Sequence, residues 1–357
     1  MTRQAGSIRN RFSSGISALV AGLLLGACAA PPQAPPAAPR QAPGIPVYVK
    51  PDNTLKPGIL GRNERMIVYQ PGPGDTLKSI ARQLLGSEEL DWKIADTNGV
   101  SRAQPGQPLI VPLQPLNAVG VGSERYQTVP ILCYHRFGGA AGKMSIAPDQ
   151  FAAQMDWLAR NDYRVIRLSQ LTAFLQGREA LPQRSVVITI DDGYESVYRH
   201  ALPVLRKYNF PATLFAYTDF IGAGDALSWS QLQELAKSNL IDIQAHSKSH
   251  RNLIERLAGE DDTRYRQAID AETRVPRELL EKRLGIEVRH FAYPYGDANE
   301  TVLESLTRHQ YQLAVTVNPG GNGFFAQPMM LRRTMIFGDY DLDTFKAKLQ
   351  TSRPLAP

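Results

Sequence analysis

The sequence has little cysteine. Its 357 residues contain only Cys28 and Cys133, so a disulfide framework is excluded and stability has to come from an apolar core. Cys133 lies within an apolar stretch, where we expect it to behave as a small buried hydrophobe.

The sequence also lacks an excess of basic residues in its larger part, although the net charge is +6. Residues 1–66 contain 8 Lys and Arg against 2 Asp and Glu, which leaves 32 against 32 in the remainder. Because the positive charge is confined to the N-terminal segment, no nucleic-acid partner is expected.

The N-terminal apolar run, residues 16–25, is too short for a spanning helix. It follows three arginines and ends at Leu-Gly-Ala-Cys28, which is typical of a lipoprotein signal peptide over residues 1–27. We therefore expect Cys28 to be lipidated and to hold the protein in the cell envelope. Ala29 is compatible with the periplasmic face of the outer membrane. An uncleaved helix with a fortuitous cysteine is the alternative.

A Pro/Ala-rich segment follows, and residues 28–65 are predicted to form a stiff, extended tether. Residues 66–112 then read as a small α+β module in which Asp75 caps a helix. The segments that carry this interpretation are residues 74–81, 92–98 and 104–112. They resemble a LysM domain, a family that folds as two helices on a two-stranded sheet and binds N-acetylglucosamine polymers. A spacer that binds nothing is the alternative.

Beyond a linker at residues 113–128, short apolar runs alternate with amphipathic helical patterns up to residue 350. This alternation predicts an α/β fold, a β/α barrel in one domain over residues 129–350. The expected strands lie at residues 129–135, 163–166, 186–190, 212–217, 241–245, 288–293, 312–317 and 331–336. The expected helices lie at residues 148–161, 195–208, 230–238, 262–284 and 299–309.

Two of these strands end in residues suited to binding a metal ion. Asp191 and Asp192 close one strand, and His246 and His250 follow another. Active sites of α/β folds gather at such strand ends. Asp192 and the two histidines offer one oxygen and two nitrogens, an open set for Zn²⁺ or a similar ion, with Asp191 as the base. The histidine spacing lets both rings share a face if the segment turns helically. Asp-Asp-Gly alone is also a common turn sequence.

A third strand end supplies the sequence Arg289-His290-Phe291-Ala292-Tyr293-Pro294-Tyr295-Gly296. The three segments in this order resemble the motifs of the NodB-type polysaccharide deacetylases, carbohydrate esterase family four, over residues 129–345. The resemblance implies an incomplete, seven-stranded barrel. It also implies that Asp191 is the base, that Asp192, His246 and His250 hold a divalent metal, and that Arg289 orients Asp191.

The same resemblance implies that Tyr293, Pro294 and Tyr295 wall the sugar site. We expect the backbone amide of Tyr295 to bind the oxyanion that develops on the acetyl carbonyl. Arg289 suits its implied role because its planar guanidinium can hold a carboxylate ionised, although a surface ion pair is the alternative. Trp229 either stacks on a sugar ring or anchors its helix.

The chain departs from the family pattern in lacking a C-terminal Leu-x-His, whose histidine protonates the leaving amine. His135, which follows Tyr134 at a strand end, is our candidate for this acid. A Tyr-His pair near the start of the domain is similar to the subgroup that deacetylates poly-β-1,6-N-acetylglucosamine. Support of a neighbouring residue is the alternative role for His135.

These observations predict a metal-dependent hydrolase, with Zn²⁺ as the expected cofactor, that removes N-acetyl groups from envelope polysaccharide. Peptidoglycan is the expected substrate, because the LysM-like module favours it. Exopolysaccharide of the poly-β-1,6-N-acetylglucosamine type, favoured by the Tyr134–His135 pair, is the first alternative. A lipoprotein that binds the cell wall without catalysis and an esterase of acetylated xylan are further alternatives. Cobalt and nickel suit the same ligands.

Overall fold

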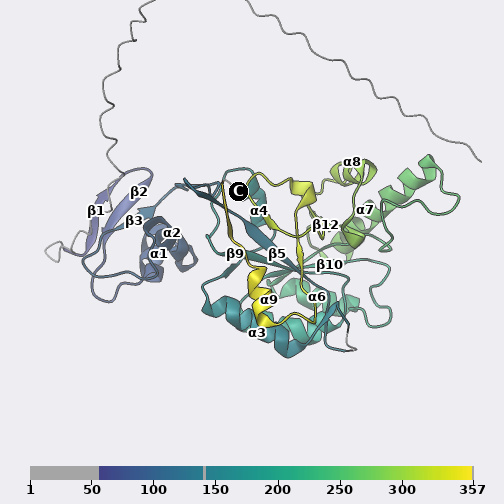
Figure 1. Cartoon of the computed structure of the whole chain (residues 1–357), viewed down its shortest axis with the longest axis horizontal. Coiled ribbons are helices and arrows are strands. Elements are labelled where there is room, and N and C mark those ends of the chain that lie inside the picture. The colour runs from purple at the N-terminus through teal and green to yellow at the C-terminus, as the bar shows by residue number, and fades with distance from the viewer. Residues whose placement is uncertain (1–55, 140–141, 356–357) are drawn as a thin grey trace, which may run out of the picture. The chain divides into compact units, whose positions relative to one another are not determined.

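The computed structural model describes residues 56–139 and 142–355 (Figure 1). The predicted signal peptide, Cys28 and nearly all of the predicted tether lie outside these residues. Within the described ranges, every helix is too short or too polar to cross a membrane.

A small module with its own apolar core begins the described chain. It consists of β1 (Gly58–Arg62), β2 (Met66–Gln70), α1 (Leu77–Leu85), η1 (Glu88–Leu90), α2 (Asp91–Asn98) and β3 (Leu109–Pro112). β2 pairs antiparallel with both β1 and β3. β1 lies within the predicted tether, so the folded region starts earlier than residue 66 and the sheet has three strands instead of two.

Helix α1 is capped by Thr76, and the prediction of Asp75 as the cap is wrong. The side chain of Thr76 accepts a hydrogen bond from the Ser79 amide at 3.0 Å, and the Ser79 hydroxyl oxygen accepts one from the Thr76 amide at 2.9 Å. Asp75 instead accepts from the Gly72 amide at 2.8 Å and closes the preceding turn. The identification of the module as LysM stays a prediction.

The larger domain contains most of the strands and helices. Its strands are β4 (Arg125–Gln127), β5 (Val129–Tyr134), β6 (Arg136–Phe137), β7 (Ser145–Ile146), β8 (Arg164–Val165), β9 (Ser185–Ile190), β10 (Ala212–Ala216), β11 (Ile241–Ala245), β12 (His290–Ala292), β13 (Leu313–Val315), β14 (Gly321–Asn322), β15 (Thr334–Met335) and β16 (Ser352–Pro354). Its helices are α3 (Pro148–Arg160), α4 (Gln170–Leu175), η2 (Val197–Ala201), α5 (Leu202–Tyr208), α6 (Trp229–Lys237), α7 (Asp262–Leu284), η3 (Pro294–Gly296), α8 (Glu300–Arg308), η4 (Pro328–Met330) and α9 (Leu342–Ala347).

The strands of this domain curl into a barrel. β5, β9, β10, β11, β12 and β13 lie side by side and are all parallel. β15 pairs parallel with β5, and a single bridge from Val315 to Leu331 joins its segment to β13. Helices flank the strands in Figure 1. The predicted incomplete (β/α) barrel is therefore confirmed.

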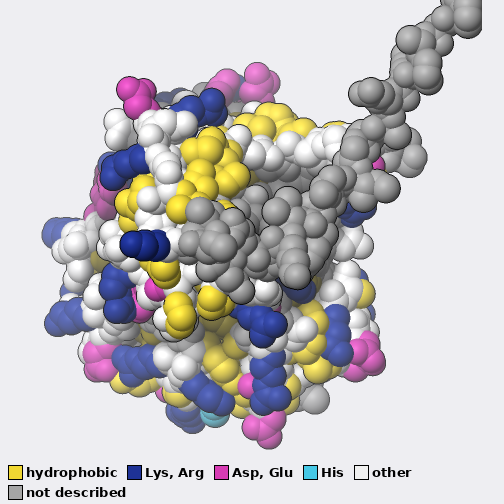
Figure 2. Space-filling view, turned by 90° about the vertical axis from the view of Figure 1, so that its left-hand side faces the viewer, with side chains coloured by type: hydrophobic (Ala, Val, Ile, Leu, Met, Phe, Trp, Pro, Cys, Tyr) yellow, Lys and Arg dark blue, Asp and Glu magenta, His cyan; other side chains and the backbone are white. Residues whose placement is uncertain are grey.

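β5, β9 and β10 are strands whose two faces are both covered, and they are accordingly apolar. Every residue of β5, β9 and β10 is buried, which is typical of parallel strands in a β/α fold. Figure 2 shows one face of the molecule, on which Lys and Arg side chains lie scattered among Asp, Glu and apolar ones.

The predicted ends of the larger domain need correction at both sides. β4 lies within the predicted linker, and it pairs antiparallel with β16, which lies beyond the predicted end at residue 350. This two-stranded sheet joins the start of the domain to its end. Helices α3, α6, α7 and α8 lie where the periodicity predicts them, whereas α4, α9 and β14 are additional.

Candidate active site

The barrel brings the ends of four parallel strands together. His135 follows β5, Asp191 follows β9, His246 follows β11 and Tyr293 follows β12. Because the carboxyl ends of parallel strands lie at the same edge of a sheet, residues far apart in sequence share one site.

Asp192, His246 and His250 form a compact set of metal ligands. One oxygen of Asp192 lies 3.4 Å from Nε2 of His250 and 3.6 Å from Nε2 of His246. Nδ1 of His246 lies 2.8 Å from the backbone oxygen of Ala292, to which it donates. This bond assigns the proton of the neutral ring to Nδ1, so Nε2 presents a lone pair to the carboxylate.

The electrostatics of this set fit a divalent cation. Burial, with the negative charge of Asp191, raises the pKa of Asp192 to about 7. Burial also lowers the pKa of His246 to about 3 and that of His250 below its usual value. Lone pairs therefore converge without a positive charge of their own, and the residues present would hold a cation through one oxygen and two nitrogens.

The backbone around these ligands is unusual, and the segment between the two histidines does not form the helical turn that would let their spacing alone bring the rings together. Asp192, Ser247 and His250 have φ values of 73°, 69° and 62°, in the left-handed region that non-glycine residues rarely adopt. The His250 amide donates to the Ser247 hydroxyl oxygen at 2.9 Å. A tight non-helical turn, held in a costly conformation, thus directs both rings to one point.

Glu272 on α7 holds this turn in place, and the sequence reasoning missed it. Its carboxylate accepts from the amides of Lys248 and Ser249, each at 2.9 Å, and from the Ser249 hydroxyl at 2.6 Å. Glu272 is 6% exposed. The available signal was its spacing, because Glu272 shares a helix face with Tyr265, Ile269 and Leu280, which are buried.

Asp191 is bound by Arg333. Two guanidinium nitrogens donate to its two carboxylate oxygens, each at 2.7 Å, and the arginine side chain is fully buried. Burial alone would raise the pKa of Asp191, but the guanidinium outweighs it and holds that pKa well below its usual value. The carboxylate is consequently ionised and fixed in direction, as a base requires.

Arg289 does not perform the role implied for it. Its side chain pairs with Glu287 at 2.6 Å and is 26% exposed. Arg289 precedes β12, whereas Asp191 follows β9, so the parallel strands place the two residues at opposite ends of the barrel. Arg333, which lies beside β15, supplies the guanidinium instead.

His135 and Cys133 complete the surroundings of Asp191. Ligand atoms of these three residues all lie within 4.8 Å of one another. The Cys133 thiol donates to Asp191 at 3.4 Å, and burial raises the pKa of this thiol well above its usual value. Burial lowers the pKa of His135 to about 4, so its ring is neutral. Cys133 is thus buried, as predicted, but it also contacts the candidate base.

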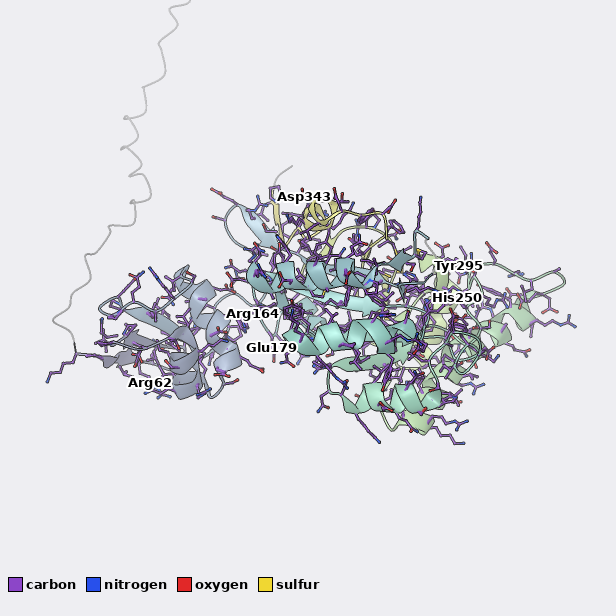
Figure 3. All side chains as sticks on the ribbon, turned by 90° about the horizontal axis from the view of Figure 1, so that it is seen from below. Arg62, Arg164, Glu179, His250, Tyr295 and Asp343 are labelled. Atoms are coloured by element: carbon purple, nitrogen blue, oxygen red, sulfur yellow. The ribbon has the colours of Figure 1, made fainter. Side chains whose placement is uncertain are left out.

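The predicted sugar wall is only partly present. Tyr293 is fully buried and its hydroxyl donates to the Met329 backbone oxygen at 2.8 Å, so it packs the core. Pro294 is also buried. Tyr295 has a φ of 61° and is 61% exposed, and its ring lies 5.1 Å from that of His250 (Figure 3).

Trp229 belongs to the anchoring alternative. It is the first residue of α6, it packs against the barrel core, and the Arg283 guanidinium lies 5.1 Å from its ring. That it also contacts substrate stays a prediction.

Comparisons with known proteins agree with this site. Residues 178–314 match the model of the polysaccharide deacetylase family. Over 200 residues the chain is 28% identical to the putative polysaccharide deacetylase YxkH of Bacillus subtilis, covering 56% of this chain and 68% of that protein. It is 25% identical over 249 residues to the poly-β-1,6-N-acetyl-D-glucosamine N-deacetylase of Escherichia coli K12, covering 60% of this chain. The chain spans 37% of the length of that relative.

A solved structure extends the likeness to the fold. The structure of IcaB from Ammonifex degensii aligns with a TM-score of 0.56 and 28% identity, covering 63% of this chain and 98% of that chain. Together, the comparisons show that the larger domain is similar to polysaccharide deacetylases in sequence and in fold, which supports the predicted enzyme class.

Proposed function

We propose that the larger domain is a metal-dependent hydrolase that removes N-acetyl groups from an N-acetylglucosamine polymer of the cell envelope. The proposal rests on one observation: a candidate base and a set of candidate metal ligands lie next to each other. An ionised Asp191, held by Arg333 at 2.7 Å, lies beside the ligand set of Asp192, His246 and His250. A base next to a cation site is what hydrolysis of an amide requires.

The residues divide the reaction between them. A divalent cation held by Asp192, His246 and His250 would polarise the acetyl carbonyl and lower the pKa of water. Asp191 takes the proton of the attacking water, and the Tyr295 amide is the proposed donor to the developing oxyanion. Water adds to the acetyl carbon, the carbon–nitrogen bond breaks, and acetate and a free amine result.

His135 is the proposed acid that protonates the leaving amine. Its pKa, although lowered to about 4 by burial, still lies above that of Asp191, which Arg333 holds well below its usual value. A proton taken up by Asp191 therefore has a more basic acceptor within 4.8 Å. Passage of the proton through His135 to the amine follows this order of basicity.

Two polymers are candidates. Poly-β-1,6-N-acetylglucosamine is favoured by the names of the relatives from Escherichia and Staphylococcus and by the position of His135 next to Asp191. Peptidoglycan is favoured by the LysM-like module, which would tether the domain to wall glycan and raise the local substrate concentration. The first candidate has the more direct support, because it concerns the catalytic domain itself.

Acetate release from each purified polymer tests the proposal. The wild-type protein should release acetate when loaded with Zn²⁺ and lose that activity with a chelator. Asp191→Asn should still bind the cation while its rate falls by about a thousandfold. An unchanged rate in Asp191→Asn would remove this residue as the base, and activity that survives chelation would remove the cation.

We also propose that the enzyme is anchored in the envelope through lipidated Cys28, at the periplasmic face of the outer membrane. The support is the signal-peptide pattern of residues 1–27, which ends at this cysteine. Membrane fractionation compares the wild type with Cys28→Ser. Recovery of both proteins in the same membrane fraction would contradict the lipid anchor.

A further inference from the structure

A row of rings leads away from the cation site. The Tyr295 ring lies 5.1 Å from that of His250, and the His250 ring lies 5.0 Å from that of Tyr217. The row continues from Tyr217 to Phe220 at 5.0 Å, with nearly parallel planes, and from Phe220 to Tyr194 at 5.3 Å. We call these five residues the aromatic row. Its rings flank the candidate metal ligand His250, with Tyr295 as one neighbour and Tyr217 as the other.

The four carbocyclic rings of the row are not part of the apolar core. None of them belongs to either of the core clusters of the larger domain, as far as its described residues go. Tyr295 is 61% exposed, and the other rings are half-buried. Rings that pack against one another at the rim, instead of into the core, leave part of their apolar surface to solvent.

The far end of the row is held firmly. The Arg136 guanidinium lies 4.0 Å from the centre of the Tyr194 ring and pairs with Asp225 at 2.5 Å. The Glu195 amide donates to the Asp225 backbone oxygen at 2.8 Å, and the Leu227 amide donates to that of Gly193 at 2.9 Å. These bonds tie the loop that carries Phe220 to the turn after β9, so the rings are fixed before any ligand arrives.

The chemistry of the row suits a sugar chain. A pyranose ring has an apolar face of C–H groups that packs on an aromatic ring, while its hydroxyls point outward to water or polar groups. The tyrosines of the row present a phenol ring with a hydroxyl that both donates and accepts hydrogen bonds. The row thus offers neutral faces and hydroxyls over most of its length, with a charged pair only at its end.

We propose that the aromatic row is a binding subsite for the sugar units next to the one being deacetylated, running from Tyr295 past the cation site to Tyr194. This proposal rests on the proposed function, because it assumes that an N-acetylglucosamine polymer reaches His250. It adds that the sugar units next to the reacting one lie over Tyr217, Phe220 and Tyr194. Longer oligomers are therefore better substrates than single sugars.

The test compares oligomers of different length. Phe220→Leu and Tyr194→Leu keep an apolar side chain but remove the flat face, and Tyr198→Leu is the matched control. Tyr198 lies close in sequence to Tyr194, but its hydroxyl bonds Glu234 at 2.5 Å, outside the row. The readout is the ratio of kcat/KM for a long oligomer to kcat/KM for a single acetylated sugar. We expect this ratio to fall by roughly tenfold in each row variant and to stay unchanged in the control.

Equal losses of kcat/KM on the long and the short substrate leave the ratio unchanged. This result would overturn the subsite and show that the rings only support the fold. Binding of the long oligomer to Asp191→Asn, with and without Phe220→Leu, separates this proposal from the proposed function. If the wild type releases no acetate but Phe220→Leu still weakens oligomer binding, the aromatic row is supported as a subsite and the proposed function is contradicted. If Phe220→Leu binds the long oligomer as tightly as the protein without this substitution, the aromatic row is not a subsite.

Discussion

Asp191 and Asp192 are neighbours in the chain, yet the structure gives their carboxylates opposite surroundings. Arg333 holds the pKa of Asp191 well below its usual value, whereas burial and Asp191 itself raise the pKa of Asp192 to about 7. We call Asp191, together with Arg333 and His135, the base half of the site. Asp192 with His246 and His250 is the cation half.

The difference arises because the backbone changes direction between Asp191 and Asp192, at the end of β9. Asp191 continues the direction of β9 and is 2% exposed, so it meets a guanidinium from inside the barrel. Asp192 has a φ of 73°, which turns its carboxylate to the histidines at the rim. The base half is neutral within itself, while the cation half needs a charge from outside. Carboxylates with such separated pKa values can act as base and ligand side by side.

Breaking the base half should have the largest effect. Arg333→Met leaves the buried Asp191 without its counter-charge, so we expect a loss of about 3–5 kcal/mol in the free energy of unfolding. The activity should fall with it, because the pKa of Asp191 rises and its direction is no longer fixed. Urea unfolding of the cation-free protein measures the first effect, and acetate release measures the second.

A double variant distinguishes loss of a charge from loss of packing. Asp191→Leu combined with Arg333→Met replaces both charges by apolar groups, and should recover much of the stability but none of the activity. A double variant as unstable as Arg333→Met alone would mean that the guanidinium packing, and not the ion pair, carries the stability.

His135→Ala tests the base half without breaking its ion pair. If His135 protonates the leaving amine, acetate release should slow by on the order of a hundredfold, while Zn²⁺ content and stability stay close to wild type. His200→Ala, on η2, is the matched control and should be unaffected. Wild-type turnover in His135→Ala would return the role of the acid to water or another group.

The cation half should respond to pH. Because the pKa of Asp192 is raised to about 7, its contribution to stability is fully present below its usual pKa of 3.8 and is lost as pH rises through about 7. A bound cation supplies the missing charge, so stabilisation by Zn²⁺ should increase over the same interval. Thermal unfolding with and without Zn²⁺, at about pH 5 and about pH 8, measures this.

Asp192→Asn provides the control for the pH dependence. The amide cannot titrate, so the dependence of Zn²⁺ stabilisation on pH should become weaker, leaving the part due to the histidines. A wild-type protein that Zn²⁺ stabilises equally at both pH values would contradict the raised pKa of Asp192.

The two halves also differ in how well the sequence predicted them. The cation half combines short motifs at strand ends, and periodicity places the ends of β9 and β11 within a residue of their observed positions. The parallel order then brings Asp192 and His246 together. What the motifs could not predict is the left-handed turn at His250, which depends on bonds from Glu272 on a distant helix.

The base half was predicted only in part, because its charge partner is not local. Arg333 is 142 residues from Asp191. A strand was predicted at residues 331–336, but only Thr334 and Met335 form β15, so the pattern alone does not show which side chain of the segment faces the barrel interior. Two arginines are adjacent there, and Arg332 donates to the Pro319 backbone oxygen while Arg333 is buried. Which of them faces the barrel depends on the register of β15 with β5, which follows from barrel closure and from no local pattern.

Arg289→Met should have the smallest effect and separates the two arginines directly. Its ion pair with Glu287 is partly exposed, and such pairs contribute about 0–1 kcal/mol. We expect nearly wild-type acetate release and a change in unfolding free energy within that range. Arg333→Met, measured in parallel, should differ in both. A large loss of activity in Arg289→Met with unchanged stability would contradict this separation of roles. The base half would then depend on both arginines, although only the buried one contacts the carboxylate in this structure.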